Sequence, residues 1–375
     1  MTEPAATVIR LGVDGRELQE GVRTGIGRYL REVLRAASAA VWPCVVYGDA
    51  TTRLPEPLPG VVLTTLGARS TLWWDQVALP MALARDRIGV FLSPYYKSPL
   101  ASRCPAIVTI HDLFFIGYPG RPRPVFDRVL TWAARSYAAR AAAVIADSEA
   151  SRRDIVARLG VTPEKIRVIP VGLGPEFRPT TPDASTLDRY GLRRPYVLYV
   201  GNFKPHKNVP RLLRAWAGLP GDLRAAHQLV LAGGGRDGRA DLEALAASLG
   251  LGDGVAFAGL VDDRDLPAVY GGAALVVLPS LEEGFGLPAL EAMACGTAVV
   301  TSNRGALPEV VGAAGVLVDP DKDDALEAAL TAVLSSAELR ADLRRRGLAR
   351  AAEFSLERTA GRVLALCAEV GTRYP

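Results

Sequence analysis

Two glutamates eight positions apart, Glu283 and Glu291, carry the most specific chemical signal of the chain. They enclose the string Gly-Phe-Gly-Leu-Pro-Ala-Leu, between an apolar run at 274–278 and a second apolar run at 298–301. This order predicts a buried strand, a Gly-rich turn, a helix and another buried strand, which together form one βαβ unit. Because open α/β sheets bind ligands at the carboxyl ends of their strands, we expect a ligand at this turn.

The residue types favour an anion flanked by hydroxyl groups. Gly284 and Gly286 let the backbone approach a ligand closely, and the free N–H groups of the following helix favour phosphate. Pro288 suits a first helical turn because its missing N–H costs nothing there. Glu283 and Glu291 could accept hydrogen bonds from hydroxyls on the two sides of that phosphate. Either glutamate alone would be a surface residue, but the whole string describes a site for a nucleotide sugar.

The string resembles the Glu-x7-Glu signature of retaining family-4 glycosyltransferases. The resemblance implies an α/β protein with the GT-B fold, in which two Rossmann-like parallel-sheet domains face a cleft. It implies that the first glutamate contacts the donor sugar, the following amides contact sugar and phosphate, and the second glutamate holds the ribose. In this sequence those positions are Glu283, Gly284, Phe285, Gly286, Leu287 and Glu291.

A second turn, 201–208, follows the apolar strand expected at 196–200 and contains two lysines. In the resembled family a basic pair in this turn stabilises the leaving phosphate, and Lys207 matches the family lysine. The usual upstream arginine is absent: either Asn202 stands in its place or Lys204 substitutes for it. Lys204 and Arg304 remain the two candidates for a second cation.

Two further positions of the second half are donor-binding candidates by resemblance. Gly233 begins a Gly-Gly-Gly loop after the strand expected at 228–232, where the family places a loop near the nucleotide. Leu260 lies in 257–261, where backbone groups of the family contact the base. Neither segment identifies the base.

The first half contributes a histidine and two tyrosines at expected strand ends. His111 follows the apolar strand 106–110, and the resemblance implies a histidine here close to the donor sugar; a structural histidine is the alternative. Tyr95 and Tyr96 follow the strand expected at 90–92, where they either line the acceptor pocket or cover the floor of the cleft. We therefore assign catalytic roles to His111, Lys207 and Glu283.

Gly25 and Gly27 lie in a Gly-rich stretch, 21–30, after the first expected strand. Leu30 replaces the third glycine of a dinucleotide-binding fingerprint, which argues against a nicotinamide oxidoreductase. In the resembled family an N-terminal Gly-rich loop closes over the donor diphosphate. We assign Gly25 and Gly27 to that role, with a simple tight turn as the alternative.

The chain has 375 residues, too many for one typical core, so two domains are expected. Apolar runs alternate with helical patterns throughout, as in parallel sheets. We expect an N-terminal acceptor domain over 1–180, a linker rich in Pro, Gly and Thr with the boundary near 175–190, and a C-terminal donor domain over 186–355. A last helix over about 356–375, capped by Ser355, should pack back on the N-terminal domain, as the resemblance implies.

The composition fits a soluble globular protein, with 49% hydrophobic and 22% charged residues. The net charge of +4 is dispersed, without the basic block of a nucleic-acid tail. No metal-ligand spacing is present; Asp-Arg-Asp at 263–265 and Asp-Pro-Asp at 319–321 suit caps and turns. Without a signal peptide or an apolar run of about 20 residues, a cytoplasmic location is expected.

The segment 124–140 predicts a helix with Phe126 and Tyr137 on one apolar face, whereas Arg128, Arg135 and Arg140 lie on other faces. Core packing with a solvated basic side is one interpretation. A peripheral membrane contact is the other, and it would suit a lipid-linked acceptor.

These observations favour a retaining glycosyltransferase that moves a hexose-type or mannosyl-like sugar from a nucleoside-diphosphate sugar to an acceptor hydroxyl. The acceptor could be a glycan, a glycolipid or a small-molecule natural product. We expect no cofactor, no metal and no nucleic-acid partner. A sugar-nucleotide epimerase of similar fold, which needs no acceptor, and a non-enzymatic sugar-binding protein are the alternatives.

Overall fold

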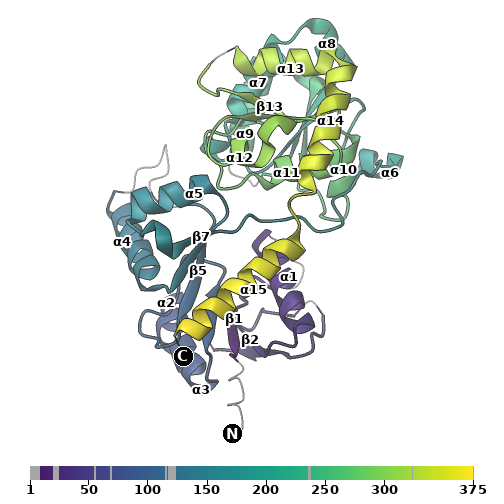
Figure 1. The fold of residues 1–375 in the computed structure, drawn as a ribbon. Coiled ribbons are helices and arrows are strands. Elements are labelled where there is room, and N and C mark those ends of the chain that lie inside the picture. The colour runs from purple at the N-terminus through teal and green to yellow at the C-terminus, as the bar shows by residue number, and fades with distance from the viewer. Residues whose placement is uncertain are drawn as a thin grey trace. The chain divides into compact units, whose positions relative to one another are not determined.

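The computed structural model describes residues 9–19, 25–54, 56–67, 70–114, 116, 124–234, 238–322 and 324–374. The chain forms two compact units: unit 1 comprises Met1–Gly172 with Ser355–Pro375, and unit 2 comprises Leu173–Phe354 (Figure 1). Each unit is described by itself.

Unit 1 is built on a seven-stranded parallel sheet in the order β3-β2-β1-β4-β5-β6-β7. Its strands are β1 (Leu11–Asp14), β2 (Cys44–Gly48), β3 (Val61–Thr65), β4 (Val90–Ser93), β5 (Ala106–Ile110), β6 (Ala143–Ala146) and β7 (Ile166–Val168). The residues of β1, β2, β4, β5 and β6 are all buried, as expected for strands that are covered on both faces.

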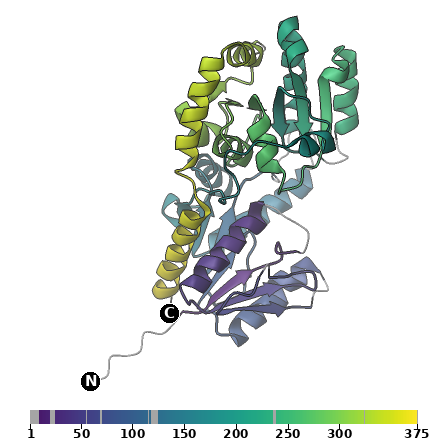
Figure 2. The same cartoon turned by 90° about the vertical axis from the view of Figure 1, so that its right-hand side faces the viewer.

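The helices of unit 1 include one from the far end of the chain. They are α1 (Gly25–Ala39), α2 (Thr71–Trp73), η1 (Trp74–Ala78), α3 (Leu79–Arg85), α4 (Pro124–Arg140), α5 (Glu149–Asp154), η2 (Ile155–Leu159), η3 (Pro163–Lys165) and α15 (Leu356–Arg373). Figure 2 shows α15 beside α1, and Val363, Cys367 and Val370 share one core cluster with Leu30 and Leu34. The Ser355 hydroxyl caps α15 by accepting from the N–H of Arg358, which confirms the predicted cap.

Unit 2 contains a six-stranded parallel sheet in the order β10-β9-β8-β11-β12-β13. Its strands are β8 (Tyr196–Val200), β9 (Gln228–Ala232), β10 (Val255–Gly259), β11 (Leu275–Leu278), β12 (Val299–Ser302) and β13 (Val316–Val318). Its helices are α6 (Ala184–Arg189), η4 (Pro205–Lys207), α7 (Val209–Gly218), α8 (Gly221–Ala226), α9 (Arg239–Ser248), η5 (Gly252–Gly254), α10 (Leu266–Gly272), α11 (Leu287–Ala294), α12 (Leu307–Val311), η6 (Gly312–Ala314), α13 (Ala325–Ser335) and α14 (Ala337–Ala351).

Both sheets reverse their strand order at one point. In unit 1, β2 and β3 are added on one side of β1, whereas β4 and the strands after it are added on the other side. In unit 2 the same reversal occurs between β8 and β11. Helices that follow neighbouring strands then lie on opposite faces, which leaves a crevice at the carboxyl ends of that strand pair. The loops after β8 and β11 begin the two segments that contain Lys207 and Glu283.

The division of the chain differs from the predicted domain limits in one segment. Residues 173–180, assigned from the sequence to the N-terminal domain, belong to unit 2. Leu173 donates its N–H to the Phe354 carbonyl, and Phe177 is buried. A Cβ on Gly271 would lie 2.1 Å from the Thr180 carbonyl oxygen, so this segment packs tightly on α10.

Candidate functional site

Lys207 and Glu283 meet at the switch point of unit 2. The Lys207 Nζ lies 2.7 Å from the Glu283 Oε1, and the two side chains are 14% and 7% exposed. The same carboxylate oxygen accepts a hydrogen bond of 2.8 Å from the hydroxyl of Ser280, which is fully buried. The structure thus brings together two of the three residues to which the sequence assigned catalytic roles, and it adds Ser280, which sequence reasoning missed.

Backbone contacts fix the two loops that carry this pair. Asn208 has a left-handed φ of 56°, a conformation that asparagine tolerates, and its amide Nδ2 donates to the Pro279 carbonyl at 3.2 Å. The N–H of Leu281 donates to the His206 carbonyl at 2.7 Å. Each contact joins the turn after β8 to the loop after β11, so the distance between Lys207 and Glu283 is set by backbone as well as by charge.

Glycine is required where the backbone passes the glutamate. Gly305 has a φ of 58°, and a Cβ there would lie 2.4 Å from the carbonyl oxygen of Glu283. The next residue, Ala306, donates its N–H to that same carbonyl at 3.0 Å. Gly286 has a φ of 98°, and a Cβ there would lie 2.6 Å from the Leu307 side chain. The loop after β12 and the start of α12 therefore pack directly against the backbone of Glu283 and of Gly286, the residue before α11.

The helix predicted after the Gly-rich turn is α11, and Glu291 lies within it. Leu287 begins the helix and Pro288 occupies its first turn, as predicted. Phe285 is buried, with its ring edge-on to Phe354 at 6.0 Å between centroids. The amides of the turn lead into α11, an arrangement that favours an anion at the start of the helix.

Glu291 is buried, not surface-exposed, and its partner was not predicted. The hydroxyl of Tyr270, at the end of α10, donates to Oε2 of Glu291 at 2.8 Å, and Tyr270 is fully buried. The hydroxyl of Thr297 in turn donates to the Tyr270 carbonyl at 2.7 Å. Two buried side chains thus hold the second glutamate of the motif in place. A sequence signal existed, because a tyrosine near the end of a helix can pack its ring and still present a hydroxyl.

His206 lies between the two lysines of the turn and is 5% exposed. Burial, together with the positive charges of Lys207 and Lys204, lowers the pKa of its imidazole to about 4, although Glu283 acts in the opposite direction. A neutral imidazole is the consistent state, since another positive charge beside two lysines would be repelled. Sequence reasoning passed over this residue.

The other predicted donor residues lie on neighbouring loops of unit 2. Asn202 accepts a hydrogen bond from the backbone N–H of Lys204 through Oδ1 at 3.2 Å, and both side chains are exposed. Gly233 has a φ of 95°, and a Cβ there would lie 2.6 Å from the Gly201 carbonyl oxygen, so the loops after β8 and β9 touch through their backbones. Leu260 is 80% exposed. Gly235, in the predicted loop, lies outside the described residues.

Arg304, one of the two candidates for a second cation, is paired within unit 2. Its guanidinium lies 3.1 Å from Asp319 Oδ1 and also contacts Asp321. The Asp-Pro-Asp turn therefore balances an arginine, in line with the turn role predicted for it. The charge of Arg304 is thus neutralised locally by these carboxylates.

In unit 1, both ring nitrogens of His111 face oxygen acceptors. Nδ1 lies 2.6 Å from the Asp147 Oδ2, and Nε2 lies 3.2 Å from the Pro94 carbonyl oxygen. A carbonyl can only accept, so Nε2 carries a proton, and an ionised Asp147 requires a second proton on Nδ1. Burial alone would lower the His111 pKa, but Asp147 and Asp112 outweigh it, and the pKa lies above its ordinary value. The geometry fits an imidazolium rather than a proton acceptor.

Asp147 is the partner that sequence analysis did not find. The next residue, Ser148, caps α5 by accepting from the Ser151 N–H at 2.9 Å. Asp147 instead is buried and turns toward His111. The available signal was positional: β5 and β6 are adjacent parallel strands, and each of these residues follows its strand directly.

Tyr95 and Tyr96 lie after β4, at the switch point of unit 1. The Tyr95 hydroxyl donates to the Glu17 Oε1 at 2.6 Å, and the Tyr96 ring is edge-on to Tyr137 at 6.2 Å between centroids. Tyr95 therefore presents a polar end near the switch point, whereas Tyr96 packs against α4.

An unpredicted charge cluster follows β1 at the same switch point. Arg16 lies 2.6 Å from Asp14 and 2.8 Å from Asp75, and its guanidinium stacks 3.8 Å above the Trp74 ring. Both carboxylates are buried. A half-buried arginine shared by two buried carboxylates orders this strand end.

Gly25 and Gly27 lie in the first turn of α1, where Gly27 is buried. Helix α1 therefore begins at Gly25, within the Gly-rich stretch 21–30. The preceding residues 21–24 of the predicted Gly-rich loop lie outside the described residues, so the loop that would close over a diphosphate is described only by these two positions.

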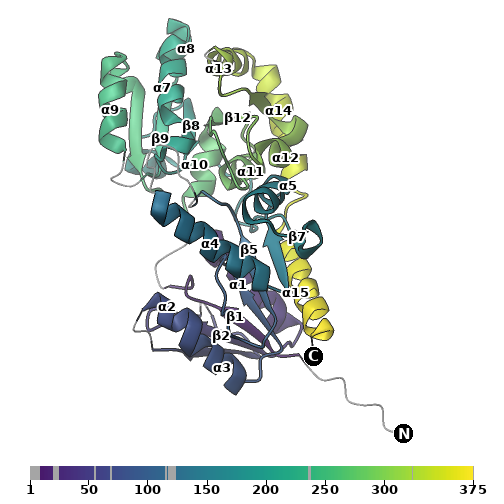
Figure 3. The same cartoon turned by 90° about the vertical axis from the view of Figure 1, so that its left-hand side faces the viewer.

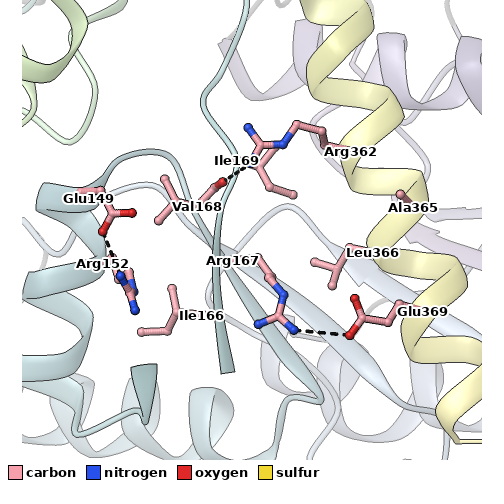
Figure 4. Close-up of a pocket in the computed structure, with 10 residues that line it drawn as sticks. All are labelled: Glu149, Arg152, Ile166, Arg167, Val168, Ile169, Arg362, Ala365, Leu366 and Glu369. Carbon is pink, nitrogen blue, oxygen red and sulfur yellow. Dashed lines mark hydrogen bonds and ion pairs between the residues drawn. The ribbon is translucent and has the colours of Figure 1, made fainter. Parts of the chain in front are cut away.

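Unit 1 also carries a surface hollow of about 470 Å³ between α5, β7 and α15 (Figure 4). Its acidic side chains are paired with its arginines: Glu149 with Arg152 at 3.1 Å, and Glu369 with Arg167 at 3.3 Å. None of the predicted site residues lines it. The lining residues are Glu149, Arg152, Ile166, Arg167, Val168, Ile169, Arg362, Ala365, Leu366 and Glu369.

In the described part of the chain, no group of three or more His, Cys, Asp or Glu side chains could hold a metal ion. Among the same residues, no helix has the length and hydropathy needed to cross a bilayer.

Known proteins resemble this chain in both units. The family description "Glycosyltransferase Family 4" matches residues 23–177, and "Glycosyl transferases group 1" matches residues 189–350. O-antigen chain mannosyltransferase B of Escherichia coli is 34% identical over 256 residues, which are 67% of each chain. For several other curated relatives the match covers between 27% and 56% of the relative's length.

Solved structures share the fold across nearly the whole chain. Sucrose-phosphate synthase from Thermosynechococcus elongatus has a TM-score of 0.79 at 24% identity, covering 97% of this chain and 100% of that one. HepE from Anabaena, solved in complex with UDP and glucose, has a TM-score of 0.75 at 22% identity, covering 96% and 99%. With these neighbours, two Rossmann-like parallel-sheet units define the GT-B fold. The chain belongs to the family-4 and group-1 glycosyltransferases.

Proposed function

We propose that this glycosyltransferase moves a hexose-type sugar from a nucleoside-diphosphate sugar to an acceptor hydroxyl with retention of anomeric configuration. The observation that carries the proposal is the contact of 2.7 Å between Lys207 and Glu283 at the switch point of unit 2, at the mouth of α11. A cation, a carboxylate and a helix start within a few residues match the needs of a diphosphate that leaves a sugar. The mannosyltransferase relative favours a mannosyl-like donor sugar.

Each residue of this site has a distinct task in the proposal. Lys207 and the amides of 284–287 stabilise the negative charge that develops on the leaving diphosphate. Glu283 accepts hydrogen bonds from sugar hydroxyls, and Glu291, fixed by Tyr270, accepts them from the ribose. Lys204 is the candidate second cation. No metal ion or cofactor is assigned a role.

Retention requires either a double displacement or attack from the face of the leaving group. Glu283 is engaged by Lys207 and Ser280, a setting that suits hydroxyl binding better than nucleophilic attack. We therefore favour front-face attack, in which the leaving phosphate takes the proton of the acceptor hydroxyl. The bond from the anomeric carbon to the phosphate oxygen breaks as the bond to the acceptor oxygen forms.

In unit 1, His111 is proposed to act as a fixed positive charge, because both of its ring nitrogens already face acceptors. Tyr95, with Glu17, offers hydroxyl and carboxylate oxygens for a polyol acceptor. This chemistry supports an acceptor that bears hydroxyl groups.

Thermal unfolding in the presence of UDP, GDP or dTDP tests the donor site. The matching nucleotide at 100-fold its dissociation constant should add about 2.7 kcal/mol of stability, and the other two should add less. Proton NMR of the glycosylated product then determines its anomeric configuration. If the protein released an epimerised donor in the absence of an acceptor, it would instead be an epimerase. No stabilisation by any of the three would refute the donor site.

A further inference from the structure

Helix α4 exposes large apolar side chains along its outer face. Val125 is 73% exposed, Phe126 53%, Val129 57% and Trp132 68%. Val125, Val129 and Trp132 follow the i, i+4, i+7 spacing that places residues on one stripe of a helix. Core packing of the face that carries Phe126 and Tyr137 was one of the two interpretations of the sequence; the structure buries Tyr137 and exposes Phe126.

The opposite face of α4 accounts for its attachment to unit 1. Ala134 and Ala138 are fully buried and share a core cluster with Val108 and Val144 of the sheet. The outer stripe is therefore not needed to hold the helix in place. Contiguous exposed apolar surface of this kind is uncommon on soluble proteins and marks a surface that contacts something else.

Arginines flank the apolar stripe. Arg128, Arg135 and Arg140 are all exposed, and Asp127 is the one acidic residue of α4, so the helix has a net charge of +2. The guanidinium of Arg135 donates to the Arg158 carbonyl, and that of Arg140 donates to the Leu100 carbonyl. Because carbonyls carry no net charge, these contacts orient the arginines without neutralising them.

A second run of exposed apolar residues lies on the same side of unit 1. Leu72 is 67% exposed, Val77 40% and Met81 68%, along the segment formed by α2, η1 and α3. Figure 3 looks onto α4 and shows α2 and α3 on the side of unit 1 that faces the viewer. The Gln76 amide, which lies 3.5 Å from the Tyr137 hydroxyl, connects the two segments.

We propose that this face of unit 1, centred on Val125, Val129 and Trp132, binds the surface of an anionic lipid bilayer. Tryptophan favours the headgroup region, and aliphatic side chains beside it enter the acyl boundary. Arginines alongside the stripe lie at the level of the lipid phosphates and are attracted by them. The inference is independent of the proposed function, because it rests on surface chemistry alone.

The charges favour a bilayer over a second copy of the chain. In a symmetric pair the same patch meets itself, which would bring the arginines of both copies together around the apolar stripe. Like charges that face each other disfavour association, whereas lipid phosphates complement every one of them.

Vesicle co-sedimentation of the full chain tests the proposal. Wild type should sediment with vesicles of phosphatidylglycerol and phosphatidylcholine in equal parts, and much less with phosphatidylcholine alone. Val129→Glu should abolish sedimentation, whereas the matched change Val62→Glu, at a 59% exposed valine of β3, should not. Arg128→Gln keeps the apolar stripe and should weaken partitioning into anionic vesicles about fivefold, the effect of one arginine near the surface.

Several results would overturn the proposal. Wild type could stay in solution with both vesicle types, or Val129→Glu could bind vesicles like wild type. Val62→Glu could also lose as much vesicle binding as Val129→Glu. A dimer in light scattering that Val129→Glu separates would assign the surface to a second copy. Nucleotide-induced stabilisation, measured on the same variants, reports on the donor site separately. A variant that keeps this stabilisation is folded, so its loss of vesicle binding would support the proposal.

Discussion

Lys207 and Glu283 neutralise each other across 2.7 Å, although one follows β8 and the other follows β11. The strands are adjacent in the sheet, so parallel topology brings residues 76 positions apart to the same edge. With both side chains largely removed from solvent, neither charge is balanced mainly by water. In the proposed reaction, sugar hydroxyls would donate to Glu283 while the diphosphate attracts Lys207, and substrate would replace the internal partner of each.

Lys207→Ala should lower kcat by about 10² to 10³, the usual effect of removing one preorganised group that stabilises developing negative charge. It should also destabilise unit 2 by on the order of 3 kcal/mol, because Glu283 would remain buried without its cation. Steady-state kinetics and thermal unfolding measure the two effects. Lys322→Ala removes an exposed lysine from the same unit and should change neither. Wild-type turnover in Lys207→Ala would contradict the site assignment.

Tyr270→Phe should weaken donor binding more than it slows chemistry, because Tyr270 touches Glu291 and not the reacting atoms. Loss of a hydrogen bond to a charged group should cost about 1.5 to 3 kcal/mol, which would raise the donor KM while kcat changes little. Tyr196→Phe is a matched control: its hydroxyl is equally buried in unit 2 and donates to the Val269 carbonyl at 2.7 Å. If both variants changed KM alike, the positioning role of Tyr270 would be lost.

The sequence predicted the donor side of unit 2 because its residues are local to strand ends. Lys207, Glu283 and Glu291 each lie within a few residues of an apolar run that could be recognised as a strand, and β8 and β9 have the predicted limits. Residues that act across elements were not recognised. Tyr270 and Asp147 become partners of Glu291 and His111 only once elements far apart in the sequence are placed side by side, so their local signals did not identify the partner of each. Ser280 lies three residues before Glu283, but only the folded loop brings its hydroxyl onto the carboxylate.

Segments without a strong apolar period were also missed. Helix α14 is rich in arginine and alanine, and only three of its residues are buried, so no apolar stripe marked it. Its cap, the Ser336 hydroxyl that accepts from the Leu339 N–H, was the available signal. Strand β7 spans Ile166–Val168, although the apolar residues Ile169 and Val171 continue the run beyond it; Pro170 between them has no N–H to donate to a sheet.

Asp147→Asn should lower the His111 pKa, because it removes the negative charge beside Nδ1. The groups that face His111 in wild type are Asp147, Asp112 and the Pro94 carbonyl, and together they raise its pKa despite burial. NMR titration of the imidazole measures the change directly. An unchanged His111 pKa in Asp147→Asn would show that the imidazolium is not maintained by this contact.

The same His111 contact gives stability a pH dependence of known sign. A folded pKa above the unfolded value of about 6.5 means that the folded state binds the proton more tightly. The stabilisation is therefore complete below about pH 6.5 and is lost as pH rises through the raised folded pKa. Urea unfolding of wild type and His111→Gln as a function of pH should differ in that window.

His206 should produce the opposite dependence at acid pH. Its folded pKa of about 4 lies below the unfolded value, so the unfolded state binds the proton more tightly. Stability should fall as pH drops from about 6.5 toward 4, and His206→Gln should remove part of that fall. Chemical unfolding between these pH values measures it, and identical slopes for the variant and wild type would show that burial does not perturb this imidazole.

Residues 173–354, expressed alone, should fold and retain nucleotide binding. Unit 2 contains its own sheet and the whole proposed donor site, and the Leu173 N–H bonds to the Phe354 carbonyl, so its two ends already meet.

Residues 1–172 alone should not fold stably, because α15 supplies part of the core of unit 1. The lost side chains, Val363, Leu364, Leu366 and Val370, would each forgo at least about 1.5 kcal/mol of burial, a sum comparable to the total stability of a domain, about 5 to 15 kcal/mol. Circular dichroism melts of the two fragments, with nucleotide added to the first, check both expectations. A cooperative melt of 1–172, or a 173–354 fragment that melts without cooperativity, would contradict the expectation that only unit 2 folds without the rest of the chain.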